Sequence, residues 1–132
     1  MPSIKGFHHT AIRSSHFDES VGFYTEVLGL KVKITWGEGS SRAAMIDAGD
    51  GNYVEIFERS AFEPAESTIL HFALRTDDCV GMTEIVRAAG RPITMEPNEL
   101  EIGSNKGPIP VKVSFFTGPD GEVVELFENR VL

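Results

Sequence analysis

The chain has 132 residues, and its 12 Lys and Arg against 20 Asp and Glu give a formal net charge of −8. This acidic balance argues against a protein that binds nucleic acid or an anionic membrane surface, because both depend on Lys and Arg. One cysteine excludes an intrachain disulfide, and 41% hydrophobic residues are typical of a globular chain that holds its own core. We expect a single cytoplasmic domain over residues 1–132, without a leader peptide or a membrane span.

The first half of the chain predicts a strand, a helix and three further strands. The opening strand covers residues 7–13. A capping box from Ser15 to Asp18 is expected to begin the helix, whose apolar stripe comprises Phe17, Val21, Tyr24 and Leu28. The remaining strands are predicted over residues 31–36, 42–48 and 52–58.

The second half predicts the same order of elements. A strand over residues 68–76 precedes a helix with an N-cap at Thr76 or Asp77 and an apolar stripe of Met82, Ile85, Val86 and Ala89. Strands follow over residues 92–95, 111–117 and 122–128. Residues 59–67 are predicted as the linker between the halves. Residues 96–110, with three prolines and two glycines, are predicted as a long loop.

Two segments of the first half recur in the second half, in the same order. The segment His9-Thr10-Ala11-Ile12-Arg13 returns as His71-Phe72-Ala73-Leu74-Arg75, 62 residues later. Residues 50–58 return as residues 120–128, 70 residues later. The chain therefore reads as a tandem duplication of a βαβββ module, with module one at about 5–59 and module two at about 68–129.

The strand period of two places a histidine and a glutamate on one face of each module. His9 and Glu55 belong to module one, and His71 and Glu125 to module two. A carboxylate in the middle of an apolar strand needs a partner, because an unpaired buried charge is costly to desolvate. Two histidines and two glutamates brought together make an N₂O₂ site for nickel, cobalt, zinc, manganese or iron.

A purely structural interpretation stands beside the metal site. Glu55 would then pair with Arg13, and Glu125 with Arg75. Each histidine would be an ordinary half-buried residue.

At these residues the sequence resembles the glyoxalase I branch of the vicinal oxygen chelate superfamily. The resemblance includes the opening histidine strand, the helix segment 23–30 and the turn 118–121 before the last glutamate strand. It implies an α+β fold in which the two tandem βαβββ modules form a curved open sheet around a metal site. The metal ligands implied are His9, Glu55, His71 and Glu125.

The resemblance also implies an activity. A metal-dependent lyase or isomerase would convert the hemithioacetal of a 2-oxoaldehyde and a thiol to a 2-hydroxyacyl thioester by enediolate proton transfer. Glu125 is then the main base and Glu55 its near-symmetric counterpart. Arg13 would hold the glutathione part of the substrate. The asparagine that bacterial glyoxalase I carries a few residues after the first glutamate is missing, since the segment ends Glu58-Arg59.

Further side chains are candidates for the substrate pocket. Tyr53, Phe57, Phe127 and Trp36 would line it, unless they serve simple core packing, and Lys106 in the long loop would contact an anionic group. No function is assigned to His8 and His16, which are expected to be structural or exposed. Cys79 is expected at a helix start, where the pKa of a thiol can fall, and is given no role.

Other members of the superfamily leave alternatives open. The chain could be another metal-dependent enzyme, such as an epimerase or a dioxygenase, or a small-molecule binding or resistance protein with a vestigial site. The partners expected are a small-molecule substrate, such as a glutathione or other thiol adduct, and a second copy of the chain in a homodimer.

Overall fold

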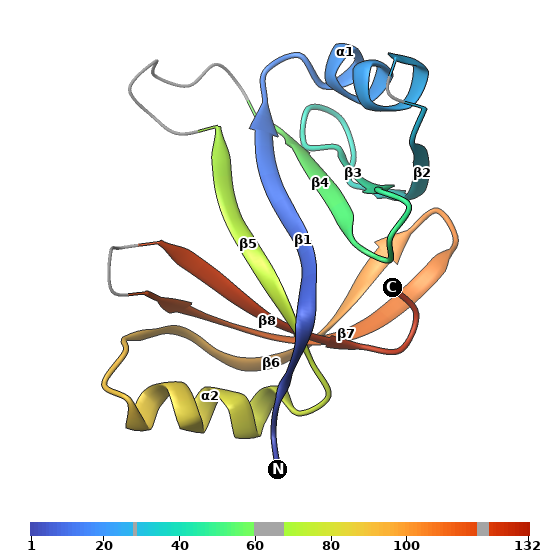
Figure 1. Cartoon of the computed structure of the whole chain (residues 1–132). Coiled ribbons are helices and arrows are strands. Elements are labelled where there is room, and N and C mark those ends of the chain that lie inside the picture. The colour runs from blue at the N-terminus through green and yellow to red at the C-terminus, as the bar shows by residue number, and fades with distance from the viewer. Residues whose placement is uncertain (28, 60–67, 119–121) are drawn as a thin grey trace. The chain divides into compact units, whose positions relative to one another are not determined.

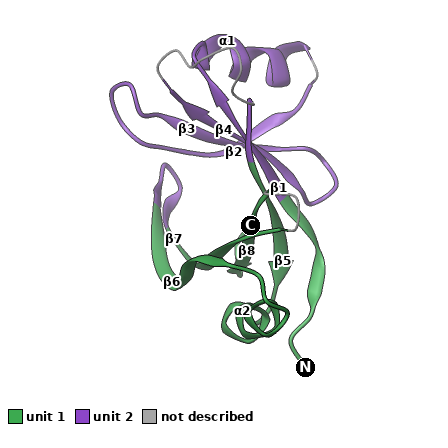
Figure 2. Cartoon of the chain, turned by 90° about the vertical axis from the view of Figure 1, so that its left-hand side faces the viewer, with its two compact units in different colours: residues 1–8, 71–102, 109–132 green, residues 9–70, 103–108 purple. Residues whose placement is uncertain are grey.

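The computed structural model describes residues 1–27, 29–59, 68–118 and 122–132 (Figure 1). Leu28 of the predicted apolar stripe, nearly all of the predicted linker and residues 119–121 of the predicted turn lie outside the described residues. The described residues divide into two compact units, coloured separately in Figure 2. Unit 1 comprises residues 1–8, 71–102 and 109–132, and unit 2 comprises residues 9–70 and 103–108.

Unit 2 is built on the elements of the first module. These are β1 (Ile4–Ser14), α1 (Phe17–Gly22), the π-helical turn η1 (Phe23–Val27), β2 (Lys31–Trp36), β3 (Ala43–Asp47) and β4 (Tyr53–Glu58). The strands lie in the order β2-β3-β4-β1, with β1 parallel to β4 and the other neighbours antiparallel. The predicted βαβββ module is therefore confirmed.

The helix of unit 2 packs on the apolar face of this sheet. Phe17, Ala44, Ile46 and Ile56 are buried together, and Val21 and Tyr24 pack against them as the helical spacing predicted. The predicted capping box is wrong. Residue His16 holds the N-cap position without a side-chain cap, and its backbone N–H is bound by Ser14 Oγ at 3.1 Å instead.

Unit 1 repeats the topology with the elements of the second module. These are β5 (Ile69–Thr76), α2 (Cys79–Ala88), β6 (Ile93–Ser104), β7 (Gly107–Thr117) and β8 (Val123–Asn129). The strands lie in the order β5-β8-β7-β6, with β5 parallel to β8 and β7 antiparallel to β8. The order of elements thus matches unit 2 strand for strand, as a duplication requires.

Helix α2 differs from its prediction at the N-cap and along its buried face. Its N-cap is Asp78, whose Oδ1 accepts the N–H of Gly81 at 2.8 Å. The buried residues are Cys79 and Thr83, whereas Ile85 of the predicted stripe is 41% exposed. Thr83 Oγ1 lies 2.8 Å from Ser114 Oγ of β7, so a hydrogen-bonded polar contact takes the place of one predicted apolar contact.

The predicted long loop at residues 96–110 is wrong, because this segment is the hairpin of β6 and β7 (Figure 1). Pro97 lies on β6, the last strand in the order, where a missing N–H is tolerated. Pro108 and Pro110 precede Val111, where the pairing of β7 with β8 begins. The hairpin tip belongs to unit 2, where Asn105 exchanges two hydrogen bonds of 2.9 Å with the backbone of Thr35.

None of the helices in the described part of the chain has the length and apolar character that a membrane crossing requires. The prediction of one domain over residues 1–132 stays a prediction.

Candidate metal centre

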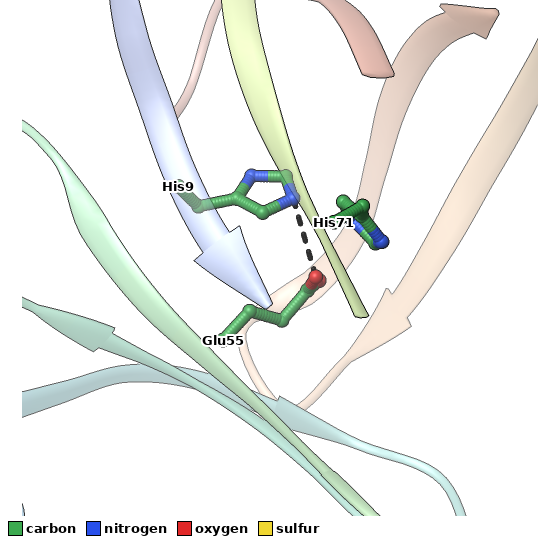
Figure 3. A group of neighbouring side chains, drawn as sticks. All are labelled: His9, Glu55 and His71. Carbon is green, nitrogen blue, oxygen red and sulfur yellow. Dashed lines mark ion pairs between the residues drawn. The ribbon is translucent and has the colours of Figure 1, made fainter. Parts of the chain in front are cut away.

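The first candidate ligand pair lies on neighbouring strands of unit 2. In the parallel register of β1 and β4, His9 stands opposite Tyr53, and Ala11 stands opposite Glu55. His9 and Glu55 are therefore diagonal neighbours on one face, and His9 Nε2 lies 3.2 Å from Glu55 Oε1 (Figure 3). Both residues are buried, with 2% and 5% of their surface exposed. The period of two along each strand predicted this common face.

The second pair repeats this arrangement in unit 1. Ala73 of β5 stands opposite Glu125 of β8, so His71 is again the diagonal neighbour of the glutamate. His71 Nε2 lies 3.1 Å from Glu125 Oε1. Glu125 is 6% exposed, and the ring of His71 meets Phe115 edge-on at 5.2 Å between centroids. Figure 3 also draws His71, which, like His9 and Glu55, carries an atom of the kind that binds a metal ion.

The geometry of each pair fits two neighbouring ligands of one metal ion. Metal–ligand bonds of about 2.1 Å separate adjacent donors by about 3.0 Å in an octahedron and by about 3.4 Å in a tetrahedron. The observed Nε2–Oε1 distances of 3.2 Å and 3.1 Å fall in this interval. Imidazole nitrogen and carboxylate oxygen are also the donors that borderline divalent metals accept.

An alanine stands beside each glutamate. Ala11 and Ala73 are fully buried and directly oppose Glu55 and Glu125 in the parallel registers. A methyl side chain at this position leaves space beside the carboxylate. The need for this space is a physical reason for the alanine at the centre of both repeated segments, His9–Arg13 and His71–Arg75.

Three of the predicted substrate-binding residues, Arg13, Tyr53 and Phe57, lie on the strands of the first ligand pair, β1 and β4. Tyr53 is 8% exposed and stands opposite His9, and Arg13 stands opposite Phe57. Trp36 meets Phe57 edge-on, with ring centroids 5.9 Å apart. Lys106 lies exposed at the turn between β6 and β7, where its backbone N–H donates to Ser104 Oγ.

Phe127 of unit 1 has a structural partner that the sequence did not indicate. Its ring is 4% exposed and packs against His8, with centroids 4.0 Å apart. His8 is fully buried, and its Nε2 lies 3.5 Å from Asn129 Nδ2. The structural role expected for His8 is thus confirmed, and His16 is exposed.

Two other residues have clear structural contacts. Arg75 donates from Nε to the carbonyl of Phe7 at 2.9 Å and from NH1 to that of Leu132 at 3.0 Å. Cys79 is fully buried, and burial raises the pKa of its thiol, so the lowered pKa considered for a helix start is wrong. A thiol in this state is a packing residue and not a nucleophile.

One cavity in the described part of unit 1 is lined by residues other than the ligand pair. It measures about 810 Å³ and is lined by residues of β6, β7 and β8 such as Glu101, Lys112 and Asn129. The described lining does not include His71 or Glu125. This cavity therefore contributes nothing to the assignment of the ligand pairs.

Comparison with known proteins agrees with the duplicated fold. Residues 6–126 match the model of the Glyoxalase/Bleomycin resistance protein/Dioxygenase superfamily. A probable lactoylglutathione lyase of Vibrio cholerae is 27% identical over 129 residues, covering 92% of this chain and 89% of that protein. The uncharacterized protein YwbC of Bacillus subtilis is 32% identical over 131 residues, covering 95% and 98%.

A solved structure shares the fold at lower identity. The methylmalonyl-CoA epimerase of Mycobacterium tuberculosis superposes with a TM-score of 0.75 at 19% identity, covering 96% of this chain and 89% of that one. With its family model matched from residue 6 to residue 126, the chain belongs to the Glyoxalase/Bleomycin resistance protein/Dioxygenase superfamily.

Proposed function

We propose that this protein is a metal-dependent lyase or isomerase of the glyoxalase I type, which converts the hemithioacetal of a 2-oxoaldehyde and a thiol to a 2-hydroxyacyl thioester. The observation that carries the proposal is the histidine–glutamate pair, present once in each module with Nε2–Oε1 distances of 3.2 Å and 3.1 Å and with the glutamate buried in both. The relatives named as lactoylglutathione lyases support the same activity.

In this proposal His9, Glu55, His71 and Glu125 together hold one divalent ion, which is nickel, cobalt, zinc, manganese or iron. The bound ion supplies Lewis acidity toward the substrate oxygens. The four ligands come from both modules. The two modules can belong to one chain or to the two chains of a homodimer.

In this proposal the glutamates carry out the proton transfer. Glu125, with Glu55 as its counterpart, would take the proton from the carbon that bears the sulfur and return it to the neighbouring carbon. The reaction is an isomerisation, so it needs no redox partner, and the carboxylate that takes the proton also returns it. Burial of both carboxylates keeps bulk water from exchanging that proton.

The side chains around the pairs would orient the substrate. Tyr53, Phe57 and Phe127 lie on the strands that carry the glutamates. Arg13 and Lys106 supply positive charge for an anionic substrate group.

Metal analysis of the purified protein followed by an assay with methylglyoxal and glutathione tests the proposal. We expect a stoichiometric divalent metal and formation of the thioester with at least one of nickel, cobalt, zinc and manganese. Absence of product with all four would overturn it. Deuterium exchange into an acyl-CoA would then indicate an epimerase, and oxygen consumption with a catechol a dioxygenase. Ligand affinity unchanged in Glu125→Gln would indicate a binding protein.

A further inference from the structure

Each module carries an arginine opposite a phenylalanine, just beyond its ligand pair. In module one Arg13 of β1 stands opposite Phe57 of β4. In module two Arg75 of β5 stands opposite Phe127 of β8. Each phenylalanine lies two residues beyond the glutamate of its strand, and therefore on the same face. The repeat thus provides two equivalent arginines, of which the proposed function assigns only Arg13 to an anionic substrate group.

The guanidinium of Arg75 is occupied by the chain itself. Its NH1 donates to the carbonyl of Leu132 at 3.0 Å, and its Nε donates to the carbonyl of Phe7 at 2.9 Å. The N–H of Leu132 and that of the residue before it both donate to Asn129 Oδ1, at 2.5 Å and 2.8 Å. These bonds fold residues 130–132, the tail, back toward Arg75. A backbone oxygen of the tail therefore stands where a carboxylate oxygen could bind the guanidinium.

The phenylalanine opposite Arg75 is covered as well. Phe127 is 4% exposed, and its ring packs against His8 with centroids 4.0 Å apart. The equivalent ring in module one, Phe57, keeps part of its surface exposed. The two arginine–phenylalanine sets are therefore equivalent in sequence, but the set of module two is closed by side chains and backbone of its own unit.

From these contacts we infer that Arg75 and Phe127 form a second carboxylate site, and that the tail is its internal ligand. The site takes a small molecule with a carboxylate, which accepts charge-assisted hydrogen bonds from a guanidinium. The inference rests on the proposed function, because it extends the role of Arg13 to the repeat of that residue. The tail excludes the substrate from module two, so the anionic group binds at module one alone. It thereby determines the orientation of the substrate between two nearly equivalent modules.

The expected strength of this exclusion follows from the occupancy of the site. A site that is accessible in about one tenth of the molecules binds an external ligand about 10-fold more weakly than an open site. Three hydrogen bonds hold the tail, and its short connection to β8 gives it a high local concentration at Arg75. We therefore expect removal of the tail to raise the affinity of this site for a carboxylate at least 10-fold.

Calorimetric titration of the metal-free protein with S-methylglutathione and with its neutral diethyl ester tests the inference. Arg13→Gln is introduced into the full chain and into a chain that ends at Asn129, so that binding at module one is weakened in both. We expect the shortened chain to bind the acid at least 10-fold more tightly than the full chain does, and the diester to show no gain. Adding Arg75→Gln to the shortened chain should abolish the gain.

Two further variants of the full Arg13→Gln chain separate release of the tail from its removal. Asn129→Leu removes the oxygen that accepts both N–H groups of the tail, and should give part of the gain. Val131→Ala changes a side chain that is 55% exposed and leaves the backbone contacts in place, so it is the control without a gain. Circular dichroism checks the fold of each variant, and Asn129→Leu takes the place of a shortened chain that does not fold.

Equal affinity of the full chain and the tail-released chain for the acid overturns the inference, as does a gain that survives Arg75→Gln. The metal-loaded wild-type protein is assayed in parallel with methylglyoxal and glutathione, which distinguishes this inference from the proposed function. Turnover without a gain in binding defeats the inference alone. A gain in binding without turnover defeats the proposed function alone.

Discussion

Replacing Glu55 with glutamine tests whether the His9–Glu55 pair is half of a metal site. The change is nearly isosteric, and it removes a carboxylate that is 5% exposed and lies 3.2 Å from His9 Nε2. Because burial of a carboxylate is costly and burial of an amide is less so, we expect the metal-free variant to be at least as stable as the wild type. The same change removes one of four metal ligands, so the stabilisation by metal must fall.

The expected loss of stabilisation by metal can be converted to a change in Tm, because the entropy of unfolding scales with the length of the chain. At a free metal concentration of about 100 times Kd, binding stabilises the folded state by about 2.7 kcal/mol. For 132 residues the entropy of unfolding is about 0.28 kcal/mol per kelvin, so Tm rises by about 10 °C. If the glutamine variant binds about 100-fold more weakly, the stabilisation at the same metal concentration is about 0.4 kcal/mol, which raises Tm by only about 1–2 °C.

Thermal unfolding followed by circular dichroism, with and without added nickel, cobalt, zinc or manganese, measures both effects. Glu125→Gln should lose the metal-induced shift in the same way, since Glu125 occupies the equivalent position in unit 1. Glu19→Gln, on the exposed side of α1, is the matched control and should keep the full shift. A full shift in Glu55→Gln would refute the assignment of Glu55 as a ligand.

Three further outcomes follow from the described contacts. Cys79 is fully buried with a raised pKa, so it should resist iodoacetamide at about pH 8 in the folded protein and react only after unfolding in urea. The lowered pKa of Glu58 beside Arg42 means that this pair stabilises the fold above the ordinary glutamate pKa of 4.5 and loses its effect as the pH falls through the lowered value. Arg42→Gln should therefore lower Tm at neutral pH but flatten its decline in acid, and an unchanged decline would contradict this account. Ile56→Ala should lower the free energy of unfolding by about 2–5 kcal/mol in urea titrations, because Ile56 is fully buried between α1 and the sheet, and a loss below about 1 kcal/mol would show that the core repacks.

The sequence predicted the strands and the ligand pairs because both depend on a short period. Side chains two residues apart share a face, so His9, Glu55, His71 and Glu125 could be assigned to common faces before any pairing of strands was known. The duplication then predicted that one arrangement would occur twice, and the parallel pairing of β1 with β4 and of β5 with β8 has the same register relation in both units. The local pattern and the repeat are therefore sufficient to predict the strands and the two ligand pairs.

The errors concern contacts that neither the strand period nor the helix period predicts. The prolines of residues 96–110 indicated a loop, but Pro97 lies on β6, the last strand in the order, and Pro108 and Pro110 precede the residues of β7 that pair with β8. The stacking of Arg59 on Phe57 and of His8 on Phe127 also escaped detection. His8 and Phe127 are separated by most of the chain, and Arg59 follows the predicted strand, where side-chain direction does not follow from the period of two.

The geometry of the two pairs indicates how metal binding depends on pH. In each pair the two atoms that approach each other, Nε2 and Oε1, are also the atoms that would bind the ion. A ring nitrogen that carries a hydrogen cannot bind a metal ion, and a carboxylate that binds one must be ionised. Protons therefore compete with metal for these ligand atoms, and we expect the metal-induced rise in Tm to be smaller at about pH 5 than at about pH 8. A rise that is constant over this range would mean that the ion binds through other atoms than the two histidine nitrogens.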